Sequence, residues 1–413
     1  MKQKIIALAL FCLYVGYGLN AQEFDIAIIG GHVIDPKNDI NEPLDVAIKD
    51  GKVALISKKI NKKRANRIVD AKGLYVVPGL VDMHAHGFFG VEDGHYLRNS
   101  FYAVPPDGFT FRNGVTTLVD AGSAGWKSFQ TFKEQTIDRS HTRILSFLNI
   151  VGEGMKGGVW EQDTSDMDAK LSAQVARRYS DLIVGFKVAH FRGEGEDYYV
   201  PIDRAIEAGN MAGNIPVMLD GKLEDAILKR FRPGDIFTHV YGRPIIDTVT
   251  NKVKPFVLEA RKRGLIYDVG YGGASFKYAN AIPGTKDGFY PDVISTDLHG
   301  GSMNAAMKDI LSIMSKFMAM GMGLEDIITA VTWHPAKTIK REELGNLSVG
   351  SEGDVTVLSL RDGKFGFYDQ QGTKMSGTKK FECQVTIKGG RVFYDLNGLT
   401  APLPRVISGL PSM

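Results

Sequence analysis

Hydrophobic residues in the middle of the chain form short, nearly continuous runs, and each run ends in or near a glycine or a polar residue. Eight runs of this kind occupy residues 79–87, 115–123, 142–152, 181–190, 215–221, 235–242, 264–272 and 292–300. Near-continuous apolar runs are typical of parallel strands that are buried on both faces. Segments with a helical pattern separate several runs, for example residues 168–180 and 253–264. The pattern therefore predicts alternating strands and helices.

Eight strand–helix units within residues 80–335 predict a (β/α)8 barrel of the TIM type, an α/β fold that usually takes about 250 residues. A doubly wound open sheet is the alternative. No GxGxxG motif opens the first unit, which argues against the dinucleotide-binding version of that sheet. Barrels of this type carry their chemistry at the carboxyl ends of the strands. The polar residues that end the runs are therefore the candidates for a functional site.

The two flanks of this region have a different pattern. Within residues 22–79 and 336–395, short β-like stretches alternate apolar and polar positions, and Asp-Gly or Gly-Gly pairs divide them. This pattern predicts β-hairpins. We expect both flanks to build one small β-sandwich subdomain, with the barrel inserted between them. Residues 396–413 remain as a C-terminal tail that carries no clear signal.

The first 21 residues have the features of a secretory signal peptide. Lys2 and Lys4 precede an apolar stretch, and cleavage is expected after Ala21. An uncleaved membrane anchor is the alternative, but the apolar stretch is short for a membrane span. We therefore expect export, to the periplasm. Cys383 is then the one remaining cysteine, so that the mature chain has neither an internal disulfide nor a cysteine zinc cluster.

Composition and charge narrow the choice of partners. Hydrophobic residues make up 44% and charged residues 23% of the chain, as in ordinary globular proteins. The formal net charge of +3 provides no strong field for nucleic acid. We expect a small-molecule substrate, no nucleic acid and no stable membrane insertion after signal cleavage. Whether the chain forms a homo-oligomer stays open.

Residue types that bind metals lie at the ends of four predicted strands. His84 and His86 are two positions apart, so both imidazoles point to the same side of the first strand. Lys187 lies within the fourth apolar run, and a lysine is rarely buried without a partner. His239 ends the sixth strand and Asp297 the eighth. Each residue alone has an ordinary structural explanation, but the strand ends of a barrel converge on one ring, which predicts a shared metal site.

Several of these segments resemble the landmarks of the amidohydrolase superfamily, in particular its deacetylase- and dihydroorotase-like members. The segments are, in chain order, PGLVDMHAHG, GFKVAHF, RPGDIFTHVYG, ISTDLHG and GNLSVGSEGDVTVLSL. The resemblance extends over residues 24–395. It implies a metal-dependent hydrolase on a (β/α)8 barrel, with a small β-sandwich that both termini build.

The resemblance also implies roles for individual residues. His84, His86 and Asp297 would bind a first metal ion, and His239 would bind a second. Lys187, carboxylated by CO2 to a carbamate, would bridge the two ions. One or two divalent metal ions are thus implied, with zinc as the expected metal.

The fifth predicted strand departs from the family pattern. It ends in Asp220, where a histidine that binds the second metal is usual. An aspartate is also a good ligand for zinc or manganese, so direct ligation is one interpretation. Two alternatives are that Asp220 lies beside the ligands without binding the metal, or that the second metal is lost. A plain Asp-Gly turn is the least favoured interpretation once the strand is placed in the barrel.

Residues around the predicted mouth are candidates for substrate contacts. Tyr271 stands where related sequences often carry a histidine, and His334 stands where an asparagine is usual, which indicates a structural position. An arginine at the mouth would suit a substrate carboxylate through paired hydrogen bonds. The candidate substrate-binding residues are Arg192, Tyr241, Arg243, Tyr271 and His299.

The resemblance finally implies a reaction. The metals would lower the pKa of a bound water, and the resulting hydroxide would attack the carbonyl carbon of an amide or ester. Asp297, as the catalytic residue, would carry the proton from the water to the leaving group. A non-catalytic ligand-binding barrel, or a lyase or decarboxylase on the same scaffold, is the alternative. The sequence does not specify the substrate.

Overall fold

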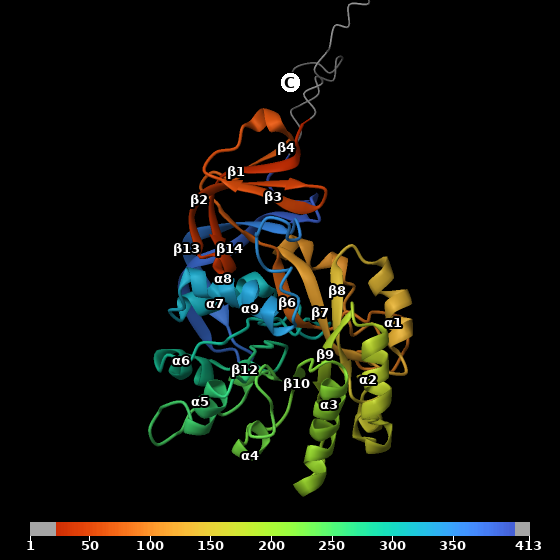
Figure 1. The fold of residues 1–413 in the computed structure, drawn as a ribbon. Coiled ribbons are helices and arrows are strands. Elements are labelled where there is room, and N and C mark those ends of the chain that lie inside the picture. The colour runs from red at the N-terminus through yellow and green to blue at the C-terminus, as the bar shows by residue number, and fades with distance from the viewer. Residues whose placement is uncertain (1–21, 401–413) are drawn as a thin grey trace, which may run out of the picture.

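The computed structural model describes residues 22–400, so the expected signal peptide lies outside the described residues. Its central part is a curled sheet of seven parallel strands, which follow one another in sequence order (Figure 1). These strands are β6 (Leu80–Ala85), β7 (Val115–Gly125), β8 (Arg143–Asn149), β9 (Ile183–Val188), β10 (Val217–Leu219), β11 (Ile236–Phe237) and β12 (Ile266–Tyr267). Each lies within one of the first seven apolar runs or extends it by two residues. The α/β class and the order of the strands are therefore as the sequence predicts.

The eighth apolar run, residues 292–300, lies between the two edge strands of this sheet but is not a regular strand. Val293 pairs with Asp268, the residue after β12, and Leu298 pairs with Ala85 of β6, each through an isolated bridge. Asp297 interrupts the extended backbone because its φ of 50° is in the left-handed region. The sheet is thus curled so far that its first and last strands share one neighbouring segment.

Helices connect most of these strands and cover the outside of the curled sheet (Figure 1). The helices are α1 (Phe129–Gln135), α2 (Ala169–Arg178), α3 (Val200–Met211), α4 (Asp225–Leu228), α5 (Pro255–Lys262), α6 (Tyr278–Lys286), α7 (Ile310–Ala319), α8 (Leu324–Val331) and α9 (Trp333–Thr338). Asp168 caps α2, because its Oδ1 accepts hydrogen bonds from the amides of Lys170 and Leu171. Among residues 22–400, no helix has the length and apolarity that a membrane crossing requires.

Two layers of apolar side chains stabilise this part of the chain. Inside the curl, alternate residues of the strands pack on one another, such as Val81 and Met83 of β6 and Phe147 of β8. Outside, residues such as Phe186 of β9 and Ile202 of α3 belong to the core between strands and helices. Both faces of each strand are therefore buried, which is why the strands are continuous apolar runs in the sequence.

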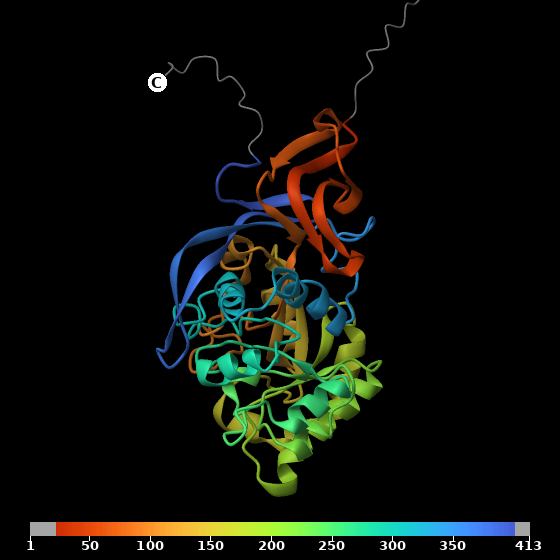
Figure 2. The ribbon, with the colours of Figure 1, turned by 90° about the vertical axis from the view of Figure 1, so that its left-hand side faces the viewer.

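Strands from both ends of the described chain form a second sheet, of eight strands, that lies beside the central part (Figure 2). Its strands are β1 (Phe24–Asp35), β2 (Ile40–Lys49), β3 (Lys52–Ser57), β4 (Ala65–Asp70), β5 (Tyr75–Pro78), β13 (Val355–Tyr368), β14 (Lys374–Lys388) and β15 (Arg391–Asp395). The two ends meet where β5 pairs with β13, for example through Val76 and Val357. Both flanks of the chain thus contribute to one β-structure.

Polar contacts join the second sheet to the central part. Arg143, at the start of β8, donates hydrogen bonds to Asp354 Oδ2 at 2.5 Å and to Glu352 Oε2 at 3.1 Å. Thr356 Oγ1 donates to the carbonyl oxygen of Gly114 at 2.6 Å. These contacts lie at the amino ends of β7 and β8, so the carboxyl ends stay free of the second sheet at this point.

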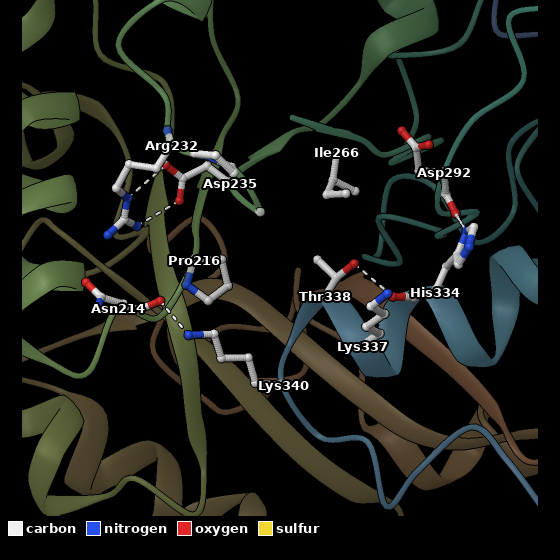
Figure 3. Close-up of a pocket in the computed structure, with 12 residues that line it drawn as sticks. Asn214, Pro216, Arg232, Asp235, Ile266, Asp292, His334, Lys337, Thr338 and Lys340 are labelled. Atoms are coloured by element: carbon white, nitrogen blue, oxygen red, sulfur yellow. Dashed lines mark hydrogen bonds and ion pairs between the residues drawn. The ribbon is translucent and has the colours of Figure 1, made fainter. Parts of the chain in front are cut away.

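A pocket of about 560 Å³ lies at the amino ends of the later strands (Figure 3). His334 of α9 lines it, with Nδ1 3.0 Å from the carbonyl oxygen of Asp292, which agrees with a structural position. Asp235 is almost fully buried there and accepts hydrogen bonds from the amides of Val217 and Arg232, both at 2.8 Å. The Arg232 side chain also binds this carboxylate. Asp235 therefore fixes the starts of β10 and β11.

Replacement of Asp235 by alanine should destabilise the protein, because the amide of Val217 and the partly buried Arg232 would lose their acceptor. We expect the free energy of unfolding to fall by about 2–4 kcal/mol. Urea unfolding followed by fluorescence measures the change. The control is Asp362→Ala, which removes an exposed ion pair with Lys379 and should leave the midpoint nearly unchanged. Equal midpoints for the two variants would contradict this role of Asp235.

Candidate metal centre

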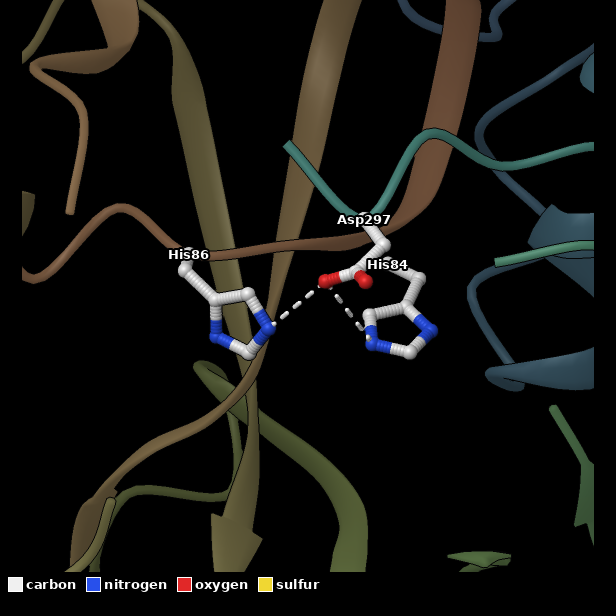
Figure 4. Close-up of side chains that lie close together, drawn as sticks. All are labelled: His84, His86 and Asp297. Carbon is white, nitrogen blue, oxygen red and sulfur yellow. Dashed lines mark ion pairs between the residues drawn. The ribbon is translucent and has the colours of Figure 1, made fainter. Parts of the chain in front are cut away.

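Three side chains converge where β6 and the segment around residue 297 end (Figure 4). His86 Nε2 lies 3.0 Å from Asp297 Oδ1, and His84 Nε2 lies 3.7 Å from the same oxygen. All three residues are buried, and their donor atoms lie within 4.8 Å of one another. Two imidazole nitrogens and a carboxylate oxygen form a donor set that suits zinc and related divalent ions.

The second nitrogen of each imidazole has a partner of its own. His84 Nδ1 lies 2.9 Å from Thr238 Oγ1 and 3.3 Å from Asp268 Oδ2. His86 Nδ1 lies 3.0 Å from Ser123 Oγ. Both Nε2 atoms are thereby directed toward one point. Metal-binding histidines characteristically have one nitrogen anchored in this way, so the residues present fit a divalent ion.

Asp268 is a buried carboxylate that the sequence patterns did not single out. Its two oxygens accept hydrogen bonds from Thr238 Oγ1 and Ser295 Oγ, both at 2.6 Å, and Oδ2 also faces His84. Burial raises the pKa of this carboxyl, although the two hydroxyl groups oppose the effect. The signal that could have found it is the same as for Asp220, namely a carboxylate that closes an apolar run.

Lys187 of β9 lies directly beside His84 and is 1% exposed. Its Nζ is 3.2 Å from His84 Nε2 and 3.4 Å from Met218 Sδ. Burial lowers the pKa of the amine, against the opposing effect of nearby carboxylates such as Asp220. The lysine needs Gly122 of β7 as a neighbour, because a Cβ there would lie 2.6 Å from the Cβ of Lys187. The structure thus brings this lysine next to His84, on the ring of strand ends that the sequence predicts.

Asp220 and His239 complete the ring of ligand candidates. The Asp220 amide donates to the carbonyl oxygen of Val188 at 2.9 Å, so the residue still lies in register with β9. Asp220 Oδ2 is 3.5 Å from His239 Nε2, whose other nitrogen is 2.6 Å from the carbonyl oxygen of Gly270. The rings of His239 and His84 lie 5.0 Å apart. The side chain of Asp220 therefore faces the ligand candidates, which a plain turn residue would not do.

Three basic side chains surround the carboxylate of Asp220. Arg243 Nη2 lies 2.5 Å from Oδ1, whereas His239 and His190 present their Nε2 atoms to Oδ2 at 3.5 and 3.6 Å. Burial alone would raise the pKa of Asp220, but His239 and the other cations outweigh it and hold this pKa well below its usual range. Asp220 is therefore ionised.

His190 is the second residue that the sequence patterns missed, although it lies within the segment GFKVAHF. Its Nδ1 is 2.8 Å from Oε1 of the buried Glu161, which orients Nε2 toward Asp220. His190 also lines a pocket of about 790 Å³, whose wall includes Tyr96, Tyr102 and Trp160. The pocket therefore adjoins the ring of ligand candidates and provides room for a small substrate.

Three of the candidate substrate-binding residues lie near this pocket or the ring. Arg192 is exposed and lines the pocket. His299 lies between the two, with its ring 6.2 Å from that of His86 and 5.1 Å from that of Tyr102. Arg243 binds Asp220, so its partner in the structure is a carboxylate of the protein itself.

The other two candidates, Tyr241 and Tyr271, are fully buried in the core. The Tyr241 hydroxyl donates to the carbonyl oxygen of Phe289 at 2.9 Å, and the Tyr271 hydroxyl donates to that of Tyr368 at 2.8 Å. The ring of Tyr271 also stacks on Phe276 at 4.4 Å. Both tyrosines hold neighbouring segments together in this structure, and neither lines the pocket beside the ring.

The fold and the ring of ligand candidates define a class of α/β enzyme that binds a divalent metal at the carboxyl ends of parallel strands. The chain belongs to the amidohydrolase family. The model of that family matches residues 276–393. A deacetylase of Brucella anthropi is 33% identical over 351 residues, which cover 83% of this chain and 85% of the relative. A deacetylase of Agrobacterium fabrum is 32% identical, with 82% and 84% of the two chains covered.

Solved structures of similar proteins agree with this assignment. The chain resembles the crystal structure of an adenine deaminase with a TM-score of 0.80 and 26% identity, over 90% of this chain and all of that one. It resembles the crystal structure of a dihydroorotase with a TM-score of 0.77 and 29% identity, over 89% and 98% of the two chains. The family identifies the chain as a metal-dependent hydrolase that acts on carbon–nitrogen bonds.

Replacement of Asp268 by asparagine should weaken metal binding, because His84 would lose the carboxylate that anchors its Nδ1. We expect the affinity for a divalent ion to fall about 10- to 100-fold. Competition with a chromogenic chelator measures this change. The control is Asp82→Asn, which alters an equally buried carboxylate whose hydrogen bonds go to Thr296 and to backbone. A smaller loss for Asp268→Asn than for the control would contradict the anchoring role.

Proposed function

We propose that the chain removes an acyl group from a small amide or ester by hydrolysis of the acyl C–N or C–O bond. The reaction would take place at the ring of side chains around His84, His86 and Asp297. The observation that carries this proposal is the buried His-His-Asp group beside Lys187. The deacetylase relatives and the amidohydrolase family show that the chain is a metal-dependent hydrolase of amide bonds. They do not favour the alternatives of a non-catalytic binding barrel or a lyase.

We further propose a division of the ring between two divalent ions. His84, His86 and Asp297 would hold the first, while Asp220 and His239 would hold the second. Zinc suits this set of nitrogen and oxygen donors. A bound divalent ion would supply Lewis-acid chemistry, since it acidifies water and polarises a carbonyl group. The adjacent pocket of about 790 Å³ would accommodate the substrate, with Arg192 and His299 at its edge.

Asp297 is the proposed catalytic residue. Burial favours the protonated carboxyl, but His86 and the other histidines outweigh it and lower the pKa of Asp297, so its carboxylate is available as a base. It would accept a proton from the attacking water and pass it to the leaving nitrogen or oxygen. The bond from the carbonyl carbon to that atom then breaks. His86 and Asp297 would hold the same ion, and their donor atoms already lie 3.0 Å apart, which keeps the carboxylate in place for both transfers.

Lys187 would act as a carbamate. Its buried amine favours the neutral form, which is nucleophilic. The nitrogen would attack the carbon of CO2, a nitrogen–carbon bond would form, and a proton would leave to water. The product is anionic and offers two oxygens as metal ligands, so that it could bridge the two ions. A buried cation is thereby converted into a ligand.

The overall organisation and the location are also proposals. Residues 292–300 would close the curled sheet as the eighth strand of a (β/α)8 barrel over residues 80–335, supported by their bridges to both edges. Residues 22–79 and 336–395 would form the β-sandwich subdomain. Residues 1–21 would direct export to the periplasm.

An Asp297→Asn variant should keep the fold but lose turnover, because an amide cannot accept the proton of the attacking water. We expect kcat to fall about 100- to 10,000-fold while most of the metal is retained. Hydrolysis of acylated amino acids and acetyl esters, with metal analysis of the same samples, measures both effects. The control is Asp292→Asn, at the other end of the same segment. Turnover at the rate of the unmodified protein would contradict the role of Asp297.

Incubation with isotopically labelled bicarbonate and metal should produce a carbamate signal in the carbon NMR spectrum, because Lys187 is buried beside ligand candidates. The signal should be absent in Lys187→Met. It should persist in Lys316→Met, which removes another strongly buried lysine, whose partners are the Tyr271 hydroxyl and a backbone carbonyl. A signal that survives in Lys187→Met would place the carbamate elsewhere.

A further inference from the structure

We propose that Arg243 is a positioning residue for the second metal site. It binds one oxygen of Asp220 and thereby leaves the other oxygen as a single-atom ligand, in the place of the histidine nitrogen that is usual in the family. This inference rests on the proposed ligand role of Asp220. It replaces the prediction from the sequence that Arg243 contacts the substrate.

The two oxygens of Asp220 have different surroundings. Oδ1 lies 2.5 Å from Arg243 Nη2, a short, charge-assisted hydrogen bond. Oδ2 lies 3.5 Å from His239 Nε2 and 3.6 Å from His190 Nε2, and both distances are longer than a good hydrogen bond. Two donor atoms that share a tetrahedral zinc ion at about 2.0–2.1 Å are roughly 3.3–3.5 Å apart. Oδ2 and the His239 nitrogen thus have the separation of two ligands of one ion, whereas Oδ1 is already occupied.

Arg243 also compensates for the difference in charge between an aspartate ligand and a histidine ligand. A neutral imidazole adds no charge to a metal site, but an aspartate adds one negative charge. Carboxylates at Asp297 and Asp268 already lie in the same buried region. The guanidinium adds a positive charge on the side of Asp220 away from His239, and it is about one-third exposed, so that it remains partly hydrated. Asp220 and Arg243 together therefore carry the same net charge as a histidine.

The local backbone places Arg243 for this contact. His239 has a φ of 59°, and the 3-10 turn of Val240–Gly242 follows it directly. The amide of Gly242 donates to the carbonyl oxygen of His239 at 2.9 Å. A side chain at Gly242 would clash, since its Cβ would lie 2.6 Å from the carbonyl oxygen of Ser275. One tight turn thus places the side chains of both His239 and Arg243 beside the carboxylate of Asp220.

Two further observations separate Arg243 from the pocket beside the ring. Asp220 is its one ion-pair partner in the described chain. The residue also does not line the pocket of about 790 Å³ beside the ring.

The test compares Arg243→Gln with Arg243→Lys in the full-length chain loaded with zinc or cobalt. A positioning residue predicts that Arg243→Gln lowers kcat at least tenfold, changes KM less than threefold and alters the visible spectrum of the cobalt form, which reports ligand geometry. Arg243→Lys should restore kcat to within about threefold, because one N–H donor and one positive charge suffice. The matched control is Arg230→Gln, which removes a similar arginine–aspartate pair with Asp203 and should change none of these quantities.

A double-mutant cycle with Asp220→His makes the test specific. A histidine at position 220 needs no partner for a second oxygen, so adding Arg243→Gln to Asp220→His should cost less than twofold in kcat. An equal loss in both backgrounds would overturn the inference. A raised KM with an unchanged kcat and an unchanged cobalt spectrum would also overturn it, in favour of a substrate contact.

Asp220→Ala separates the two proposals. If this variant retains both metal ions and the cobalt spectrum of the unmodified protein, the proposed ligand role of Asp220 is wrong. The proposed role of Arg243 is then wrong as well, because it depends on that ligand role. If Asp220→Ala loses the second ion while Arg243→Gln behaves like the unmodified protein, the ligand role stands and only the inference about Arg243 is wrong.

Discussion

The burial of ionisable side chains at one end of the curled sheet is the constraint on which the rest of the site depends. An unpaired charge in an apolar interior is very costly, so each buried group must be neutral, paired or bound to a metal. Burial lowers the pKa of the Lys187 amine and so favours its neutral form, and Asp297 is paired with His86. Asp220 meets the condition through three basic neighbours. The site is therefore one interdependent set of charges rather than a collection of separate ligands.

The fold satisfies this constraint by bringing strand ends together with little space between them. Glycines lie where two ligand candidates approach the backbone. A Cβ at Gly272 would lie 2.3 Å from Asp297 Oδ2, and a Cβ at Gly270 would lie 2.8 Å from His239 Nδ1. Both glycines have positive φ and follow β12, the seventh strand. The same short segment carries Asp268, so it both anchors His84 and leaves room for Asp297.

Much of this arrangement could be predicted because it depends on strand order alone. The periodic apolar runs located seven strands, and their polar ends located His84, His86, Lys187, His239 and Asp297. The sequence could not show that the eighth run is irregular, because the φ of 50° at Asp297 leaves no mark on hydrophobic periodicity. It also missed contacts between distant loops. His190 and Glu161 meet only because two connections fold over the same pocket.

Arg243 illustrates most clearly what a sequence leaves undetermined. The sequence predicts that an arginine at the mouth would pair with a substrate carboxylate. In the structure Arg243 pairs with a carboxylate of the protein itself, that of Asp220. The aspartate at position 220, where the family usually has a histidine, and the arginine 23 residues later form one ion pair. A buried carboxylate needs a cation beside it, and the turn after His239 supplies one in Arg243. A change of residue type at one position of a family is therefore best interpreted together with the charged side chains that can reach it.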